Sequence, residues 1–442
     1  MIIPAITALK KQLRDASAQS LSKPQVFSVI CEPFSGLLWL ANNPQFERTW
    51  WADRDQKHTR AGLGIADSIS GPFNDSLQTI GQKLAQKTAQ NPKFYYRGGI
   101  RFPSRFPLSP EWHPFGYYRF TLPLIELVHT PEGCHINCNW FPKTHLTISE
   151  QVDWILNCLD RVNFDLKSIS TLPAVMAKTE TPTQVQWEAQ VSQAQGQFHA
   201  KKMDKLVLAR CSRFTFESSL DPFALLVRMT TPSPPGIFQY AFQVSPDETF
   251  LGVSPEQLFH RQGRQLATEA IAGTQSADQP IDNLCQNKAA MEEHHWVAVM
   301  IQNAIAPICE TWGASLPKVI QLPKVSHLYQ LFQATLKEGI TDADLLTALF
   351  PTPAVAGYPV KAALEALQIS AEFDRGWYSG VVGLWSQEEA QVVVAIRSAL
   401  IQAETAYVYS GAGIVSDSIA EAEWQELNDK MRNYTDVFNR DV

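Results

Sequence analysis

The segment YSGAGIVSDSIAEAEWQELNDK, residues 409–430, gathers residue types that could bind ions. Its second half predicts a helix from about residue 419, and helical spacing places Glu423, Glu426 and Lys430 on one face. Two carboxylates beside an ammonium group could hold a cation and an anion together. The alternative is a solvated Glu–Lys pair, which adds only a few tenths of a kcal/mol to helix stability. Taken by itself, this segment favours the solvated pair.

The same segment also contains a glycine-rich stretch and a helix-capping pattern. Gly411 and Gly413 flank an alanine and predict a turn whose backbone amides could approach an anion. Ser418 and Glu421 have the S-x-x-E spacing of a capping box. We therefore expect Glu421 to satisfy backbone donors at the start of the helix and to take no part in a site.

A second acidic point lies on the helix predicted over residues 288–305. Helical spacing puts Glu293 in a stripe whose other members are apolar: Ala290, Val297, Met300 and Ala304. A carboxylate buried in such a stripe requires a cation or a hydrogen-bond donor as its partner. Glu292 lies about 100° round the helix and competes for this place. His294 and His295 flank the stripe, where histidines are more often packed or hydrogen-bonded than metal-ligating.

Two basic residues belong to runs that predict strands. Arg397 interrupts the apolar run QVVVAIRSALI, and a buried guanidinium must be paired, with a planar fork that suits a carboxylate. Lys205 begins the run DKLVLARC and shares a strand face with Val207 and Ala209. Burial disfavours the charged form of a lysine, so this residue could act as a base, whereas nearby glutamates would favour the charged form. Either residue could equally be one half of a structural ion pair.

One further carboxylate stands at the end of a predicted strand. The run GVSPEQLF places Glu256 after a Ser–Pro turn that follows the strand ETFLGV. A carboxyl group there can protonate a leaving group if its surroundings raise its pKa. The alternative is an acidic residue at a helix N-terminus after a proline, which is a common structural arrangement.

The elements that must position these residues follow a mixed pattern. Residues 1 to about 180 carry short alternating runs that predict antiparallel strands, and a helix is expected over 149–162 with Ser149 as its N-cap. The polar run KTETPTQ, residues 178–184, is the best candidate boundary. Helical and strand patterns alternate beyond it. We therefore predict the α/β (α+β) class with antiparallel β-sheets flanked by helices.

The composition of the chain excludes several classes of partner. A net charge of −7 and a pI of about 5.8 provide no basic surface for nucleic acid, so an anion site must be built locally or by a metal. The seven cysteines are scattered and indicate a reducing compartment, and the pair Cys134 and Cys138 is explained better by strand alternation than by zinc binding. No apolar run approaches the roughly 18 residues of a membrane span. We expect a cytoplasmic protein with no membrane partner.

Together these segments resemble the chorismate-utilising enzymes, which include isochorismate, salicylate, anthranilate and aminodeoxychorismate synthases. The resemblance covers residues 200–430, where nine motifs occur in the family's order: DKLVLAR, FLGVSPEQLF, TEAIAGT, KAAMEEHHWVAVMI, VSHL, PTPAVAGYP, DRGWYSGVVG, VAIRSALI and YSGAGIVSDSIAEAEWQELNDK. It implies a large single domain, in which residues 1–180 form an N-terminal β-rich portion and residues 181–437 the chorismate-binding catalytic portion.

The resemblance also implies a Mg²⁺ site and a substrate site. Glu293 and Glu426 match the family's metal ligands, with Glu423 acting through water, and Mg²⁺ prefers a few carboxylates, several waters and substrate oxygens. Arg397 and Tyr378 match the residues that grip the pyruvyl carboxylate of the substrate. The remaining substrate positions implied by the resemblance are Gly273, Thr274, His327, Gly411, Gly413 and Lys430. One departure is Ala290, where the family often has another acidic residue.

Two positions discriminate among members of the family. Lys205 matches the lysine that activates water in isochorismate and salicylate synthases, and Ala272 stands where aminodeoxychorismate synthases have a nucleophilic lysine. Water is therefore the expected nucleophile: Lys205 would remove its proton during attack on ring C2, and Glu256 would protonate the departing C4 hydroxyl. The chain has no amidotransferase segment, and we expect a monomer without an amidotransferase subunit.

The resemblance thus predicts a Mg²⁺-dependent isochorismate synthase acting on chorismate in quinone (menaquinone or phylloquinone) or siderophore synthesis. The nearest alternative is a salicylate synthase, which goes on to eliminate pyruvate. Ala354 stands where salicylate-forming members tend to have threonine, which favours stopping at isochorismate. A third alternative is a non-catalytic relative that binds only Mg²⁺ and an anion, although such a protein would have no reason to retain both an acid and a base.

Overall fold

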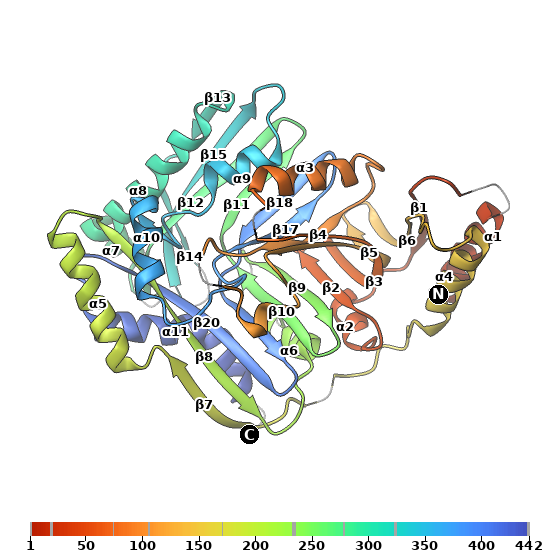
Figure 1. Cartoon of the computed structure of the whole chain (residues 1–442), viewed down its shortest axis with the longest axis horizontal. Helices are drawn as coiled ribbons and strands as arrows, with labels where there is room; N and C mark the ends of the chain where they lie inside the picture. The colour runs from red at the N-terminus through yellow and green to blue at the C-terminus, as the bar shows by residue number, and fades with distance from the viewer. Residues whose placement is uncertain are drawn as a thin grey trace.

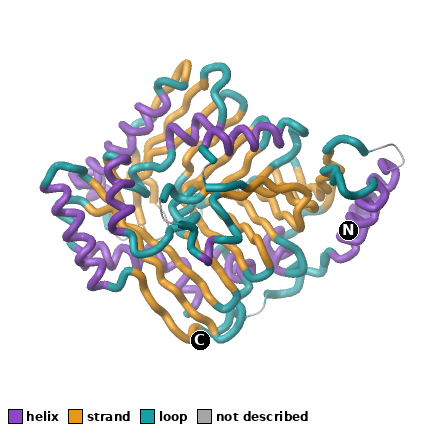
Figure 2. The backbone as a smooth tube through the Cα atoms, viewed as in Figure 1, coloured by secondary structure: helices purple, strands orange, loops and turns teal. Residues whose placement is uncertain are grey.

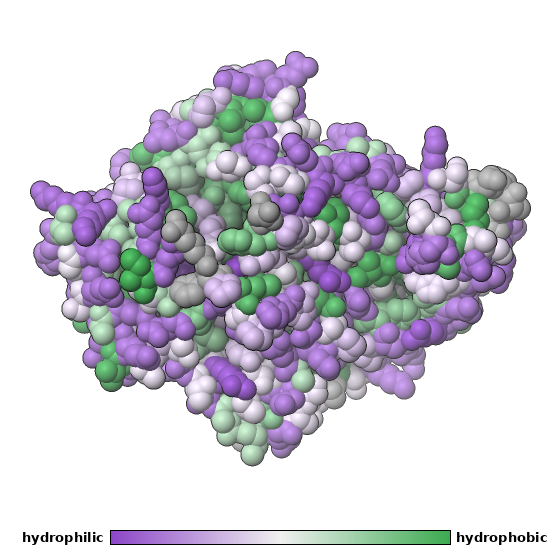
Figure 3. Space-filling model, in the orientation of Figure 1, coloured by the Kyte–Doolittle hydropathy of each residue, from purple (hydrophilic) through white to green (hydrophobic). Residues whose placement is uncertain are grey.

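The computed structural model describes residues 2–17, 21–73, 75–104, 107–169, 171–231, 236–276, 279–321 and 325–439. Within these ranges the strands join into one antiparallel network, with helices packed on its faces and around its edges (Figures 1 and 2). Polar residues cover most of the face shown in Figure 3, and apolar residues appear there in small patches. No helix in the described ranges is long and apolar enough to cross a membrane.

The strands of the network are short to medium in length. Their bounds are β1 Gln25–Cys31, β2 Arg48–Ala52, β3 Thr59–Ser70, β4 Tyr96–Ile100, β5 Tyr118–Thr130, β6 Gly133–Trp140, β7 Val175–Thr181, β8 Lys205–Phe216, β9 Phe238–Ser245, β10 Glu248–Ser254, β11 Gln257–Gln262, β12 Gln265–Ser276, β13 Cys309–Ala314, β14 Lys318–Gln321, β15 Val325–Leu336, β16 Gly357–Tyr358, β17 Val381–Trp385, β18 Glu389–Val394, β19 Ser398–Gln402 and β20 Thr405–Ile414.

The helices pack mainly on the outside of the strand network. Their bounds are α1 Ile2–Ser17, α2 Gly36–Ala41, α3 Leu77–Thr88, α4 Ile148–Arg161, α5 Gln184–His199, α6 Pro222–Met229, α7 Ile281–Gln286, α8 Lys288–Ile305, α9 Asp342–Leu349, α10 Val360–Ser370 and α11 Ala420–Phe438. Helix α11 packs on β20, and α8 packs on β12. These two contacts bring the acidic helices of the sequence to the sheet.

Strand order divides the network into two runs that diverge from the long strand β5. One run is β5–β3–β2–β9–β10–β19–β20–β8, and the other is β5–β4–β17–β18–β11–β12–β15. Strands before residue 180 therefore pair directly with strands after it, as β2 does with β9 and β4 with β17. The α/β class with antiparallel sheets in one large domain is confirmed. The division at residue 180 stays a prediction.

A cluster of buried aromatic side chains packs against the strand network. Trp112, Phe115, Phe250 and Trp377 are at most 1% exposed, and their rings meet edge to face at centroid distances of 5.4 to 6.5 Å. Such pairs add to the gain from apolar burial. Tyr378 follows directly on Trp377, so this core anchors one wall of the site described below.

Two local expectations about helix N-termini are wrong. Helix α4 begins after Thr147, which forms a capping box with Glu150, so Ser149 is not the N-cap. Helix α11 begins after Ile419 with no side-chain cap. The hydroxyl of Ser418 instead accepts from the Val415 amide at 3.0 Å. Since Ser418 lies one position before the N-cap, no capping box with Glu421 can form.

The glycine stretch lies in strand β20, where a turn was expected. Gly411 pairs with Ala209 of β8, and Gly413 pairs with Val207. The Val207 amide donates to the carbonyl of Ala356 and its carbonyl accepts from Arg375, so both point away from β20. Because antiparallel pairs alternate, the amides of Gly411 and Gly413 also point away from β8. The amides of Gly411 and Gly413 therefore point toward the side of β20 on which the site lies.

Arg397 does not lie within a continuous strand either. The run QVVVAIRSALI divides into β18 and β19, and Arg397 stands between them with φ of +52°, a left-handed conformation uncommon for arginine. Three contacts over-determine this bend: the Arg397 carbonyl accepts from the Tyr434 hydroxyl at 3.0 Å and from the Val253 amide at 3.1 Å, and the Ser379 amide donates to Ala395 at 2.9 Å. The bend turns the guanidinium out of the sheet and into a cavity.

Candidate active site

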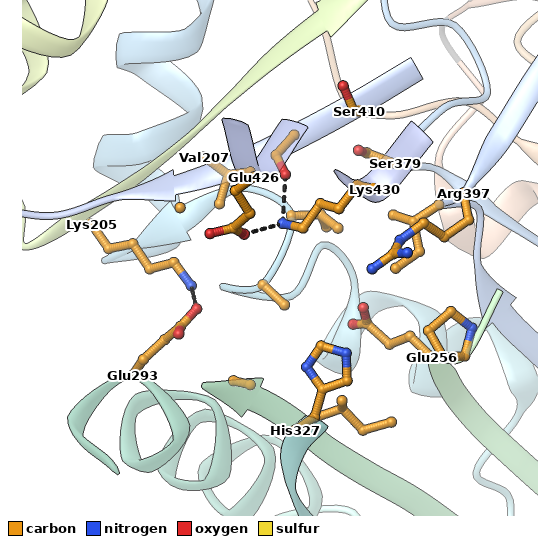
Figure 4. Close-up of a pocket in the computed structure, with 18 of the residues that line it drawn as sticks. Lys205, Val207, Glu256, Glu293, His327, Ser379, Arg397, Ser410, Glu426 and Lys430 are labelled. Carbon is orange, nitrogen blue, oxygen red and sulfur yellow. Dashed lines mark hydrogen bonds and ion pairs between the residues drawn. The ribbon is translucent and has the colours of Figure 1, made fainter. Parts of the chain in front are cut away.

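A cavity of about 260 Å³ opens between the far ends of the two strand runs (Figure 4). Its walls come from strands β8, β12, β15 and β20, from helices α8 and α11, and from the loops beside β11, β17 and β19. Eleven residues predicted from the sequence line it: Lys205, Glu256, Glu293, His327, Tyr378, Arg397, Gly411, Gly413, Glu423, Glu426 and Lys430. Gly273 is the neighbour of the lining residue Ala272, and the side chain of Thr274 lies outside the described residues.

Lys205 and Glu293 form an ion pair on one side of the cavity. The Lys205 ammonium, whose side chain is 2% exposed, lies 2.5 Å from Glu293 Oε1. The Gly273 amide donates to Glu293 Oε2 at 3.0 Å. Burial acts to raise the pKa of Glu293, but the charge and hydrogen bond of Lys205 outweigh it and hold the pKa below its usual value. Glu292 is exposed, so Glu293 is the carboxylate that faces the cavity.

Gly273 must be glycine at this position. Its φ is +75°, and an added Cβ would lie 2.7 Å from the carbonyl oxygen of Ala290 in α8. The absence of a side chain lets β12 approach α8 closely enough for the amide to reach Glu293.

Glu426, Lys430 and the glycine stretch form a second group between the walls. The Lys430 ammonium lies 2.6 Å from Glu426 Oε1 and donates to the carbonyl of Gly411 at 2.8 Å. Glu423 accepts a hydrogen bond from Ser418 Oγ at 2.8 Å. Burial, with the charges of Glu426 and Glu293, raises the pKa of Glu423 to about 7. The solvated Glu–Lys pair considered from the sequence is therefore a pair that lines a cavity.

The three carboxylates suit a hard cation. Among the described residues no three acidic, histidine or cysteine side chains lie close enough together to hold a metal ion by themselves. Glu293 and Glu426 are instead each paired with a lysine, and both charges raise the pKa of Glu423. Mutual repulsion of carboxylates facing one cavity is what a divalent cation relieves, and Mg²⁺ completes its octahedron with water and substrate oxygens. The donor set therefore fits Mg²⁺.

Glu256 faces the cavity from the side opposite Lys205 (Figure 4). It is 7% exposed and stands between β10 and β11, so it does not begin a helix. Burial raises its pKa to about 7, although a hydrogen bond from Thr352 and the charges of Lys205 and Lys430 act to lower it. A carboxyl group with this pKa can hold a proton near neutral pH and release it, as a general acid must.

Arg397 and Tyr378 make up the remaining polar wall. No carboxylate forms an ion pair with Arg397 in the described part of the chain, and the guanidinium points into the cavity beside Glu256 (Figure 4). Burial lowers the Arg397 pKa, although the charge of Glu426 opposes this. Tyr378 stacks on Tyr409, with ring centroids 5.2 Å apart at 15°. A guanidinium held inside a cavity without a carboxylate partner is suited to an anionic ligand.

His327 lies near Glu256 and Arg397. Burial lowers its pKa to about 4, and the positive charges of Arg397 and Lys430 act in the same direction. The imidazole is therefore neutral at neutral pH. A neutral histidine can contact a substrate by hydrogen bonding and adds no charge to the cavity.

A profile of the family described as "Chorismate binding enzyme" matches residues 8–439. The chain belongs to the chorismate-binding enzyme family. Isochorismate synthase MenF of Pasteurella multocida is 35% identical over 90% of this chain and 89% of its own length. Isochorismate synthase 2 of Arabidopsis thaliana is 30% identical over 85% of this chain and 69% of its own length.

The fold of this chorismate-binding enzyme agrees with a solved structure of the same family. The menaquinone-specific isochorismate synthase MenF from Escherichia coli superposes with a TM-score of 0.86, covering 98% of this chain and all of that chain. At 22% identity in that superposition, the likeness concerns the fold.

Sequence reasoning missed two contacts that set the state of the site's acids. Thr352 donates to Glu256 at 3.3 Å, and Ser418 donates to Glu423 at 2.8 Å. Thr352 belongs to the motif PTPAVAGYP, which could have drawn attention to it. The spacing of Ser418 to Glu421 favours a capping role, which hides its contact with Glu423.

Replacing Gly413 with alanine in this chorismate-binding enzyme is expected to lower kcat by about 100-fold with little loss of stability. An added Cβ would lie 2.6 Å from Lys205 Cε and 3.2 Å from Nζ, so the lysine must move. Displacing a reacting group by about 1 Å costs on the order of 100-fold in rate. The measurements are kcat and the midpoint of thermal unfolding, each for the variant and the wild type. Gly196→Ala is the control, since nothing lies within 4 Å of that position.

Proposed function

We propose that this chorismate-binding enzyme is an isochorismate synthase that converts chorismate to isochorismate. The observation that carries the proposal is that Lys205 and Glu256 face one cavity from opposite sides, with Arg397 and Lys430 beside them (Figure 4). A base and an acid on opposite sides suit addition of water at one ring carbon with loss of hydroxyl from another. The two cationic side chains suit a substrate with two carboxylates.

Similarity to named relatives supports the same proposal. Isochorismate synthases of Pasteurella multocida and Arabidopsis thaliana match most of the chain. The Escherichia coli MenF sequence is 31% identical over 96% of this chain, and its solved structure is described as menaquinone-specific. We therefore assign the enzyme to quinone synthesis in preference to siderophore synthesis. Because water is the proposed nucleophile, the enzyme would need no amidotransferase subunit.

The substrate would be held through its two carboxylates. Arg397 and Tyr378 would bind the pyruvyl carboxylate, and the Gly411 and Gly413 amides with Lys430 would face the ring carboxylate. Mg²⁺, bound by Glu293 and Glu426 with Glu423 through water, would supply the positive charge that holds the ring carboxylate next to these glutamates. The protein groups on both carboxylates orient the ring between the acid and the base.

The chemical step transfers two protons. Once the Lys205 ammonium has passed its proton to solvent, the amine takes a proton from water as the water oxygen bonds to ring C2. The ring double bonds shift, the C4–O bond breaks, and the carboxyl group of Glu256 gives its proton to the departing hydroxyl, which leaves as water. The substrate gains one hydroxyl and loses one, so the product is an isomer. Lys205 ends protonated and Glu256 ionised, and solvent restores both.

One assay tests the function. The purified protein is incubated with chorismate and Mg²⁺, and the products are separated by chromatography. Isochorismate alone is expected, since Ala354 lines the cavity without a hydroxyl group where salicylate-forming relatives tend to have threonine. Salicylate with pyruvate would show that the second activity is present, and no turnover would favour the non-catalytic alternative.

The rate is expected to fall as the pH rises through about 7. Burial raises the pKa of Glu256 to about 7, and only its protonated form can give a proton to the leaving hydroxyl. The protonated form predominates below this pKa and is lost above it. The measurement is kcat/KM for chorismate from pH 5.5 to 9, roughly the range over which such a group changes state. A rate that stayed constant across pH 7 would contradict Glu256 as the acid.

A further inference from the structure

We propose that Thr352 and the ion pair of Arg54 with Glu269 are positioning residues that hold Glu256 for its proton transfer. The inference rests on the proposed function, because it concerns the acid of that reaction. None of the three residues lines the cavity, so each acts through Glu256. Thr352 and Glu269 belong to the motifs PTPAVAGYP and TEAIAGT, but the family resemblance assigns a role to none of the three residues.

Thr352 fixes the carboxyl group itself. Its Oγ1 donates to Glu256 Oε1 at 3.3 Å, and the two residues are 5% and 7% exposed, so little water competes for the contact. The Thr352 carbonyl accepts from the amides of Val355 and Ala356 at 3.2 and 3.1 Å. The hydroxyl is therefore presented from a closed turn. One carboxyl oxygen of Glu256 is held, and the other is left to face the cavity.

The backbone of Glu256 is held separately. Its amide donates to Ser254 Oγ at 3.2 Å, and that hydroxyl donates to the carbonyl of Val394 at 2.7 Å. The Val394 amide returns a hydrogen bond to the Glu256 carbonyl at 3.0 Å. The main chain at Glu256 is thus tied to the end of β18, so the side-chain contact with Thr352 sets the remaining freedom.

Arg54 joins this loop to a buried carboxylate from far away in the chain. Its Nη2 donates to the carbonyl of Pro255 at 2.7 Å, and Nη1 and Nη2 lie 2.8 and 2.7 Å from the two oxygens of Glu269. The hydroxyl of Tyr329 adds a donor to Glu269 at 3.1 Å. Arg54 therefore holds the residue before Glu256 and compensates a carboxylate, 4% exposed, that lies behind it.

Titratable groups from five elements or loops surround Glu256. Lys205 of β8, Lys430 of α11, Arg397 between β18 and β19 and the neutral His327 of β15 lie around the cavity (Figure 4). The charge of Glu269 of β12 acts from outside the cavity. The Thr352 hydroxyl donates to the carboxylate and so favours its charged form, whereas the negative charge of Glu269 disfavours it. Loss of the Thr352 hydroxyl should therefore raise the pKa of Glu256, and loss of the Glu269 charge should lower it. A purely structural role would not produce opposite signs.

The experiment compares the pH profiles of kcat/KM for chorismate with Mg²⁺ present. In Thr352→Val the limb on which activity falls with rising pH is expected about one unit higher, because a hydrogen bond to a charged group is worth about one to two pKa units. Its kcat should fall about tenfold from loss of orientation. Thr352→Ser should restore both values. Glu269→Gln should move the same limb to lower pH.

A matched control is Thr88→Val. Thr88 is 4% exposed, and its hydroxyl donates to the Leu84 carbonyl within α3, away from the cavity. Its pH profile should equal that of the wild type. Glu269→Gln leaves Arg54 without its partner and could fail to fold. In that case Arg54→Gln replaces it. The uncompensated charge of Glu269 should then move the falling limb of the pH profile to higher pH.

Three results would each overturn the inference. The falling limb of the pH profile could stay in place in Thr352→Val, or Thr352→Ser could fail to restore the wild-type profile. Glu269→Gln could also move the limb in the same direction as Thr352→Val. The function and the inference fail in distinguishable ways. A wild-type protein that forms no isochorismate overturns the proposed function and this inference with it. An active wild type whose variants keep its pH profile overturns the inference alone.

Discussion

Lys205→Ala is expected to lower the rate of isochorismate formation by at least about 100-fold, the contribution that a well-placed general base makes. The side chain is 2% exposed and faces the cavity from the side opposite Glu256, and alanine cannot accept the proton of the attacking water. Chorismate binding should change little, since Arg397, Tyr378 and Lys430 remain. The loss should therefore fall on kcat and not on KM.

The measurements for this variant are steady-state kinetics and calorimetric binding of chorismate. Removal of Lys205 also takes the ion-pair partner from Glu293, which keeps the Gly273 amide as a donor. A thermal unfolding scan shows whether the variant is folded. Lys178→Ala is the control for loss of a lysine ion pair, because Lys178 lies 2.7 Å from Glu180 in the edge strand β7 and does not line the cavity. Near-normal turnover in Lys205→Ala would mean that another group is the base.

Chelation of divalent cations is expected to stop turnover, and added Mg²⁺ should restore it. Glu293, Glu423 and Glu426 line a cavity that must also accept a substrate with two carboxylates, so the negative charges require a cation between them. Glu426→Gln removes one ligand charge and should raise the Mg²⁺ concentration for half-maximal activity by at least about tenfold. The measurement is a Mg²⁺ titration of activity, with metal binding followed in parallel by calorimetry.

A control for this prediction lies on the same helix. Glu421 is exposed and accepts hydrogen bonds from Gln184 and Gln425 outside the cavity. Glu421→Gln should leave the Mg²⁺ dependence unchanged. Full activity in the presence of chelator would refute the metal roles of Glu293 and Glu426.

Much of the site could be predicted because its residues lie in contiguous motifs. Helical spacing alone placed Glu423, Glu426 and Lys430 together, and the structure keeps them on one face, with Lys430 bonded to Glu426. On α8 the buried residues are Ala290, His294, Val297, Ile301 and Ile305, so the predicted stripe is only partly right, and Glu293, Met300 and Ala304 stand beside this face, partly exposed. The mixed class with antiparallel strands followed from short alternating runs. In each case the physical cause acts within about two helical turns or along one strand.

Predictions failed where a local pattern allowed two outcomes. A continuous strand and a bent chain fit the run around Arg397 equally well, and contacts from Tyr434 and Val253 select the bend. A turn and a strand fit the glycine stretch, and pairing with β8 selects the strand. Ser418 had the spacing of a cap, but its hydroxyl is bonded to Val415 and Glu423. Each outcome depends on groups that the local pattern does not contain.

The sequence by itself determined which residue types are available, which of them share a helix or strand face, and which family they resemble. Only the tertiary structure decided how these groups pair: Lys205 with Glu293, Glu256 with Thr352, and Arg54 with Glu269. These partners are 88, 96 and 215 residues apart. The protonation state of a buried group depends on burial and on charges within a few ångströms, and the packing of distant segments creates both.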